Sequence, residues 1–162
     1  MIGSVILLFF ASFYIWALYA GLVVLWFIDG KIKKEQVIHA LLAGVTAWIF
    51  TLVIKYFFPT NRPFMIDGRI ADVLLKPMDG SFPSEHTALA FALAVTVFLH
   101  DRKVGWFYLI SALIVGTARV LANVHYPIDI VGGALIGTLI AIIFEREHAF
   151  NLFVSSKRKR RR

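Results

Sequence analysis

The chain has 162 residues, of which 59% are hydrophobic and 15% aromatic, and its formal net charge is +7. Such a composition leaves too little polar surface to coat a soluble globular domain, whose apolar share is nearer ~45–50%. The chain has no cysteine, which excludes disulfide frameworks and thiolate chemistry. Its long uncharged runs indicate an integral membrane protein with an all-α fold.

The first apolar run covers residues 2–28 and contains no charged side chain. At about 1.5 Å per residue a helix of this length exceeds a hydrocarbon core of about 30 Å, so we expect one tilted span. A cleaved signal peptide is the alternative, but no basic residue precedes the run, which is also too long for a signal-peptide core. Residues 37–58 predict a second span, which Pro59 ends because the residue before a proline is pushed out of the α region.

Residues 59–82 form a long polar segment with a short apolar patch inside it, made of Ile70, Val73, Leu74 and Leu75. This pattern fits a half-buried interfacial helix or lid over residues 65–76. It fits an ordinary irregular loop equally well, because so short a pattern does not discriminate between the two.

Three more spans follow this segment. Ser84 is a suitable N-cap for a short third span that ends near Leu99. Residues 104–122 predict a fourth span and residues 128–144 a fifth. In the fifth, Gly133 and Gly137 are four residues apart, which allows close helix–helix approach. The predicted fold is a polytopic membrane bundle of about five transmembrane helices, with one domain over residues 1–150 and a basic tail over residues 151–162.

The distribution of Lys and Arg predicts the orientation of this bundle. Most of the 17 basic residues lie in segments 31–34, 102–103 and 157–162. Five spans place these segments on one side, which the positive-inside rule makes cytoplasmic. The N-terminus then lies outside, the C-terminus inside, and segments 59–86 and 119–127 meet at the extracytoplasmic face. Because the tail directly follows a membrane helix, we expect it to bind anionic lipid rather than nucleic acid.

Arg119, His125 and Asp129 stand where the fourth predicted span ends and the fifth begins. Ionisable groups at membrane depth are expensive, which indicates a functional role. A polar helix-to-helix turn that is merely solvated fits this stretch alone equally well. Pro127 suits the first position of a helix, so Asp129 falls in its first turn. From there its carboxylate can accept a hydrogen bond from Nδ1–H of His125, leaving Nε2 free as a nucleophile or base.

Two other polar groups are predicted at the same face: Lys55 with Arg62-Pro63, and Pro83-Ser84-Glu85-His86. Cations, a hydroxyl and two histidines without metal-ligand spacing indicate a site that handles phosphate. One histidine can attack phosphorus while the other protonates the leaving oxygen. The remaining histidines match no motif and are interpreted as interfacial or structural: His39, His100 and His148.

The sequence resembles the type-2 phosphatidic acid phosphatase superfamily, whose signature is Lys-x6-Arg-Pro, then Pro-Ser-Gly-His, then Ser-Arg-x5-His-x3-Asp. The corresponding strings here are Lys55-x6-Arg62-Pro63, Pro83-Ser84-Glu85-His86 and Ala118-Arg119-x5-His125-x3-Asp129. Glu85 replaces the family glycine and Ala118 the family serine. The acidic residue at position 85, with the wider strings 61–64, 81–87 and 124–129, is similar to the bacitracin-resistance subgroup, the undecaprenyl-diphosphate phosphatases.

This resemblance implies roles for particular residues. His125 would attack phosphorus and become a transient phosphohistidine, Asp129 would orient it, and His86 would protonate the departing oxygen and later activate water. No metal or other cofactor is implied. The groups implied to hold the phosphate are Lys55, Arg62, Ser84, Arg119 and the backbone amide of Glu85.

The expected function is hydrolysis of a lipid diphosphate in the cell membrane at its outer face. The subgroup resemblance implies undecaprenyl diphosphate as substrate and the monophosphate carrier, returned to cell-wall synthesis, as product. A phosphatidate or phosphatidylglycerophosphate phosphatase is one alternative. A non-catalytic lipid-binding or transport protein on the same frame is another, and the complete set of His86, His125 and Asp129 argues against it.

Overall fold

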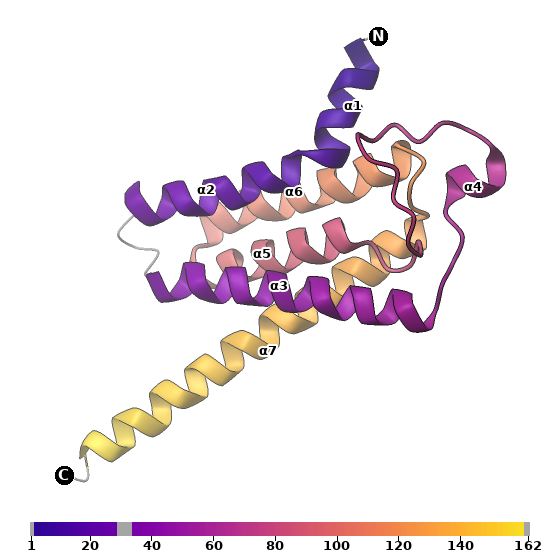
Figure 1. Ribbon diagram of the computed structural model, residues 1–162. Helices are drawn as coiled ribbons and strands as arrows, with labels where there is room; N and C mark the ends of the chain where they lie inside the picture. The colour runs from indigo at the N-terminus through magenta and orange to yellow at the C-terminus, as the bar shows by residue number, and fades with distance from the viewer. Residues whose placement is uncertain (1, 29–33, 161–162) are drawn as a thin grey trace.

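The computed structural model describes the backbone of residues 2–28 and 34–160, and the side chains of residues 5–27, 34 and 36–146. The described part of the chain is all-helical, as predicted. Figure 1 shows α2, α3, α5 and α6 side by side, with α7 crossing them obliquely and α1 turned away at the top. The elements are α1 (Ile2–Ser12), α2 (Tyr14–Ile28), α3 (Lys34–Phe57), α4 (Pro63–Asp67), α5 (Glu85–His100), α6 (Arg102–Leu121) and α7 (Pro127–Arg160).

Helix α5 is the centre of the bundle and contacts α3, α6 and α7. Glycines let α7 approach it closely: a Cβ added to Gly137 would lie 2.2 Å from the carbonyl oxygen of Ala88, and one on Gly133 would lie 2.5 Å from that of Ser84. The close approach predicted from their four-residue spacing is confirmed. It holds the start of α7 against the start of α5, where the Ser84 N–H donates to the Asp129 carbonyl oxygen at 3.0 Å.

Replacing Gly137 by alanine is expected to destabilise the protein. The added methyl group meets backbone atoms of α5, which cannot move aside as a flexible side chain would. Overpacking of this kind typically costs roughly 1–3 kcal/mol. Thermal unfolding in detergent should show a lower midpoint for Gly137→Ala, while the control Leu139→Ala, a change at an exposed position of the same helix, should alter it less. Equal midpoints for Gly137→Ala and the wild-type protein would contradict this packing.

The first predicted span is broken, and its prediction as one continuous helix is wrong. The axes of α1 and α2 meet at 57° around Phe13. Sharp kinks normally occur at proline, glycine or an inserted polar group, and neither of the first two is present here. Polar contacts do meet the break: Nη1 of Arg119 donates to the Ala11 carbonyl oxygen at 2.8 Å, and the Leu74 N–H donates to Oγ of Ser12 at 3.2 Å.

Within the described residues, three helical segments are long and apolar enough to cross a membrane: Gln36–Phe57, Arg102–Leu121 and Pro127–Arg146. They correspond to the second, fourth and fifth predicted spans. The α1–α2 pair adds a fourth candidate if its two helices act as one span. Helix α5 has 16 residues, fewer than the ~20 that usually cross a bilayer, as expected for a short third span. The structure therefore supports three to four spans, and the five-span topology stays a prediction.

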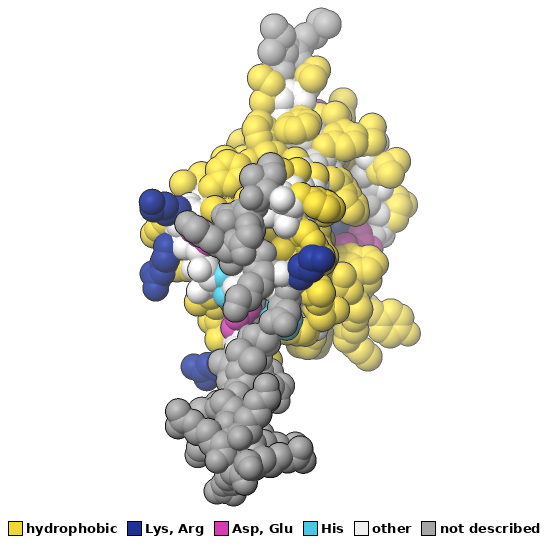
Figure 2. Space-filling model, turned by 90° about the vertical axis from the view of Figure 1, so that its left-hand side faces the viewer, with side chains coloured by type: hydrophobic (Ala, Val, Ile, Leu, Met, Phe, Trp, Pro, Cys, Tyr) yellow, Lys and Arg dark blue, Asp and Glu magenta, His cyan; other side chains and the backbone are white. Residues whose placement is uncertain are grey.

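Charged side chains collect at the end of the bundle where α6 begins. Figure 2 looks onto this end and shows Lys and Arg side chains among hydrophobic ones. Asp101 caps α6 by accepting hydrogen bonds from the N–H groups of Lys103 and Val104. Lys31 and Lys33 lie outside the described residues, as do the side chains of the basic tail. The backbone of α7 runs on to Arg160, so the predicted tail continues the last helix.

The polar segment is helical only over α4, which ends at Gly68 with a φ of 69°. The predicted interfacial helix over residues 65–76 is therefore wrong beyond Asp67, and the irregular loop is correct. Ala71 and Val73 pack against Ala118, Ala122 and Val124, whereas Leu74 and Leu75 are exposed. Ser84 occupies the predicted N-cap position of α5. Its side chain makes no capping bond and instead accepts from Oγ1 of Thr87 at 3.0 Å.

Candidate functional site

A cavity of about 480 Å³ lies at the end of the bundle where the 58–84 and 122–126 connections meet. It brings together five of the predicted site residues, from four separate parts of the chain. Lys55, Ser84 and Asp129 are buried behind this lining. The residues that line the cavity are Ser12, Phe13, Trp16, Leu52, Arg62, Leu74, Leu75, Pro77, Asp79, Glu85, His86, Arg119 and His125.

His125 and Asp129 form the pair that their spacing predicts. Helix α7 begins at Pro127, and Oδ2 of Asp129 lies 3.3 Å from Nδ1 of His125. On the other side of the ring, Nε2 is 3.2 Å from Nη1 of Arg62. A guanidinium group can only donate, so Nε2 accepts this hydrogen bond and the ring proton sits on Nδ1, facing Asp129. The tautomer set by these two neighbours leaves the Nε2 lone pair unprotonated.

His125 lies in the turn between α6 and α7 and is 2% exposed. Burial lowers the pKa of its imidazole to about 4; the hydrogen bond to Asp129 opposes this shift, and the charges of Arg119, Arg62 and Lys55 reinforce it. The ring is therefore neutral at physiological pH. A neutral imidazole with an unprotonated Nε2 is a competent nucleophile.

Ser81 is a site residue that the sequence reasoning missed. Its side chain is fully buried, and its Oγ donates to Oδ2 of Asp129 at 2.6 Å. The Tyr126 N–H donates to the same oxygen at 2.8 Å. Oδ2 of Asp129 is thus held by two donors besides His125, which fixes the direction from which it meets the ring. The sequence signal for Ser81 is its place at the start of the string 81–87, two residues before the second motif begins at Pro83.

Arg62 is almost completely buried and is fixed by several acceptors. Its Nη1 donates to the Val124 carbonyl oxygen at 2.9 Å, its Nη2 to the Gly80 carbonyl oxygen at 3.1 Å, and its Nε to the Asp79 carbonyl oxygen at 3.0 Å. Nη2 also pairs with Oδ1 of Asp79 at 2.9 Å. This arginine therefore joins the loop before α5 to the turn before α7, and it holds both beside His125.

Arg119 lies at the end of α6 and is 5% exposed. Its Nη1 is used by the Ala11 carbonyl oxygen, but its buried Nε has no hydrogen-bond partner within the described residues. A buried donor without a partner is costly, and a bound anion would satisfy it. Since Arg119 also lines the cavity, it is suited to hold a ligand's phosphate oxygens.

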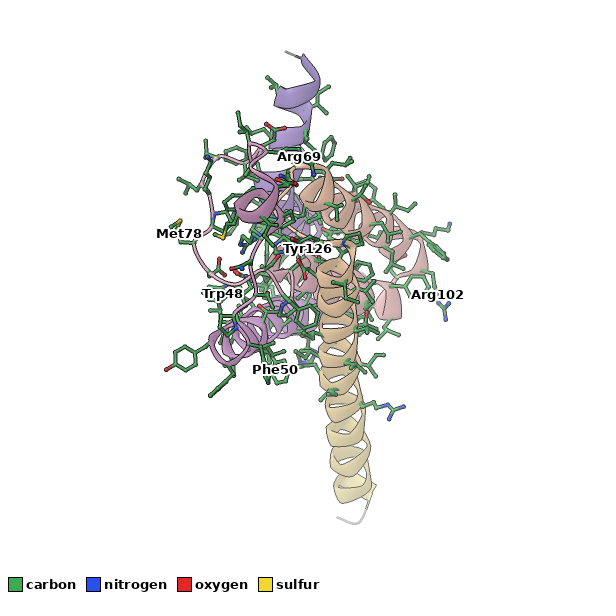
Figure 3. The ribbon with its side chains drawn as sticks, turned by 90° about the vertical axis from the view of Figure 1, so that its right-hand side faces the viewer. Trp48, Phe50, Arg69, Met78, Arg102 and Tyr126 are labelled. Carbon is green, nitrogen blue, oxygen red and sulfur yellow. The ribbon has the colours of Figure 1, made fainter. Side chains whose placement is uncertain are left out.

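Lys55 and Glu85 form an ion pair inside the site. Lys55 is 5% exposed, which is inconsistent with a lysine that reaches out to the membrane interface. The other oxygen of Glu85 accepts from Nε1 of Trp48 at 3.0 Å. Figure 3 looks onto this end of the bundle and shows Trp48 on α3, on the side where the loop with Met78 passes. The Glu85 side chain is therefore directed towards the cations.

Asp79 is a second residue that the sequence reasoning did not assign. Its carboxylate bridges Nζ of Lys55 at 2.6 Å and Nη2 of Arg62 at 2.9 Å. Partial burial would raise the pKa of Asp79, but hydrogen bonds with Lys55 and Glu85 and the positive charges of Lys55 and Arg62 keep this pKa well below its usual range. Two carboxylates, Asp79 and Glu85, thus compensate the charges of Lys55 and Arg62.

His86 lines the cavity from the first turn of α5. Ser84 precedes it but is fully buried, with its hydroxyl bonded to Thr87. A phosphate contact from Ser84 stays a prediction, as do the roles of the other site residues. Across the described residues, no group of three or more His, Cys, Asp or Glu side chains is arranged to hold a metal ion.

Several known proteins are similar to this chain in sequence. A BcrC described as a bacitracin transport permease protein, from Bacillus licheniformis, is 35% identical over 83% of this chain and 66% of its own length. The undecaprenyl-diphosphatase BcrC of Bacillus subtilis is 27% identical over 87% of this chain and 72% of its own. An undecaprenyl-diphosphatase of Sulfolobus acidocaldarius is 30% identical over 80% of this chain and 62% of its own. The chain thus spans about two thirds of the length of these relatives.

Solved structures have the same fold. The crystal structure of Aquifex aeolicus LpxE superposes with a TM-score of 0.71 and 28% identity, covering 90% of this chain and 84% of that one. A PAP2-type phosphatidylglycerolphosphate phosphatase of Bacillus subtilis superposes with a TM-score of 0.62 and 24% identity, covering 83% and 67% of the two chains. The model of the PAP2 superfamily matches residues 36–151, which include all three motifs. This chain therefore belongs to the PAP2 superfamily and is a multi-pass membrane protein.

Proposed function

We propose that this protein is a lipid phosphatase that hydrolyses undecaprenyl diphosphate to undecaprenyl phosphate and inorganic phosphate. The observation that carries the proposal is the neutral His125, oriented by Asp129 and facing a cavity with His86 and buried cations. Relatives from a bacterium and an archaeon are named undecaprenyl-diphosphatases, which supports the choice of substrate.

The reaction takes two displacements at phosphorus. Nε2 of His125 forms a bond to the terminal phosphorus while the bond to the bridging oxygen breaks, and His86 gives its proton to that oxygen. Undecaprenyl phosphate leaves. Water then attacks the phosphohistidine, His86 takes the proton of that water, and the bond between phosphorus and Nε2 breaks to release inorganic phosphate.

The cations act on the charge that spreads over the equatorial oxygens. Arg62 already contacts Nε2 of His125, so its guanidinium lies next to any phosphorus that this nitrogen attacks. Arg119 offers its unpartnered Nε, and Lys55 supplies a point charge. Fixed donors in a site of low dielectric stabilise the transition state without having to reorganise.

Phosphate release from a panel of lipids by purified protein in excess EDTA tests this proposal. We expect turnover of undecaprenyl diphosphate to exceed that of phosphatidate and phosphatidylglycerophosphate, and to survive chelation because Lys and Arg supply the positive charge. A preference for phosphatidate would replace the proposed substrate. Loss of activity in EDTA that Mg²⁺ restores would contradict the mechanism.

The Glu85 side chain is proposed to favour diphosphates over monophosphates. Its carboxylate pairs with Lys55, which fixes the position of the ammonium group and offsets its positive charge. Glu85→Gly should lower the ratio of kcat/KM for undecaprenyl diphosphate over phosphatidate by about tenfold, the effect of roughly 1.4 kcal/mol in differential transition-state binding. Glu85→Gln keeps the shape of the side chain but removes its charge, so it separates the contribution of the charge from that of the side chain's shape. An equal change for both substrates would remove Glu85 from selectivity.

We place the cavity at the extracytoplasmic face of the membrane, from the positive-inside rule. Met78 is 87% exposed in the loop beside the cavity, and the native chain has no cysteine to react. Met78→Cys should therefore be labelled by a membrane-impermeant thiol reagent in intact cells. Ser156→Cys, next to the basic tail, should be labelled only after lysis. The reverse pattern would put the site in the cytoplasm.

A further inference from the structure

The cavity lining combines polar and apolar side chains, and the mechanism uses only the polar ones. The apolar part of the lining consists of Phe13, Trp16, Leu52, Leu74 and Leu75, which come from three separate parts of the chain. Trp16 is 67% exposed and Leu75 82%, so they present open hydrophobic surface. Resting on the proposed function, we propose that these five residues, called here the stem wall, bind the first carbon units of the substrate's isoprenoid stem, next to its diphosphate.

The stem wall is tied to the phosphate-binding residues by hydrogen bonds. Ala11, whose carbonyl oxygen accepts from Arg119, lies two residues before Phe13. Ser12, the residue between them, accepts from the N–H of Leu74. The broken α1–α2 helix and the 68–84 loop are therefore joined to each other and to Arg119. Their apolar side chains keep a fixed position relative to a phosphate held by that arginine.

The arrangement matches the chemistry of a lipid diphosphate. Its phosphate oxygens are drawn to Arg62, Arg119 and Lys55, which leaves its carbon stem to meet the apolar part of the same lining. Contact with these side chains removes hydrocarbon from water at the membrane surface. The bend at Phe13 is what turns the N-terminal helix pair into part of this lining, and nothing in the reaction itself requires Phe13 or Trp16.

Two substrates that differ only in the stem test the stem wall. Farnesyl diphosphate carries an isoprenoid stem, and methyl diphosphate carries a diphosphate with almost none. Trp16→Ala and Phe13→Ala should each lower kcat/KM for farnesyl diphosphate about tenfold and leave that for methyl diphosphate within about twofold. The matched control is Trp106→Ala, which removes a similarly exposed Trp on α6, outside the cavity lining, and should change neither value.

If Trp16→Ala affects both substrates equally, or neither of them, the proposed stem wall is wrong. Turnover of undecaprenyl diphosphate by the wild-type protein would in that case still support the proposed function.

A failure of the proposed function is distinguishable from a failure of the stem wall. If the wild-type protein prefers phosphatidate and Trp16→Ala impairs phosphatidate but not methyl diphosphate, the proposed substrate falls and the stem wall binds a diacylglycerol stem instead. Thermal unfolding midpoints of all variants, measured in parallel, separate lost contacts from lost folding.

Discussion

His125→Ala is expected to abolish phosphate release while the protein stays folded. In the proposed mechanism Nε2 of His125 forms the bond to phosphorus, and Asp129 orients its ring. Its contacts are with Arg62, Ser81 and Asp129, and all three have further partners that hold them in place. Turnover should fall to the background of the assay, and acid-labile phosphoenzyme should be absent when the reaction is quenched.

His100→Ala is the matched control for the loss of a histidine. His100 pairs with Glu145 at 3.0 Å at the opposite end of α5, away from the cavity. This variant should keep near-normal activity, although its stability falls with the lost contact. Near-normal turnover by a folded His125→Ala protein would rule out the phosphohistidine mechanism.

Asp129→Asn is expected to lower kcat by roughly 10²–10⁴-fold, as tautomer-disrupting changes do in other imidazole-dependent enzymes. Ser81, Tyr126 and Nδ1 of His125 all meet the same oxygen, Oδ2. If the amide oxygen takes that place, the ring loses the negative charge that stabilises its cationic form. If the amide nitrogen takes it, the bonds from Ser81 and Tyr126 are lost, and an amide N–H beside Nδ1 moves the ring proton to Nε2 and blocks attack. The loss should appear in kcat with little change in KM, since phosphate binding does not use this carboxylate.

Asp72→Asn makes the same chemical change at an exposed position of the 68–84 loop and serves as its control. It should leave both kinetic parameters unchanged. A rise in KM with unchanged kcat for Asp129→Asn would mean that Asp129 acts on binding rather than on the orientation of His125.

The elements with regular signals were predictable from the sequence. Apolar runs predicted the membrane-crossing parts of α3, α6 and α7 within a few residues, because length and hydropathy decide membrane helices with little help from tertiary contacts. The continuation of α7 to Arg160 was not predicted. The contact between His125 and Asp129 followed from a helix that begins at Pro127. The approach of α7 to α5 followed from Gly133 and Gly137, because small residues allow close packing whatever the partner.

What the sequence did not predict depends on contacts between distant segments. No proline or glycine near Phe13 indicates the break in the sequence. The hydrogen bonds at the break come from Arg119 and Leu74, which lie far away in the chain. Asp79 and Ser81 carry no motif of their own. Their roles arise because the 68–84 loop folds back over Lys55 and Asp129, and an irregular loop has no periodic signal.

The site contains as many carboxylates as permanent cations: Asp79, Glu85 and Asp129 against Lys55, Arg62 and Arg119. These six charges sum to zero when the histidines are neutral. A bound diphosphate therefore adds negative charge that these groups do not cancel. In a medium of low dielectric, uptake of a proton offsets this added negative charge most directly. His86 can take up that proton, because a neighbouring anion stabilises its imidazolium form. In the proposed mechanism, substrate binding thus supplies His86 with the proton that the leaving oxygen needs, so acid catalysis depends on bound substrate.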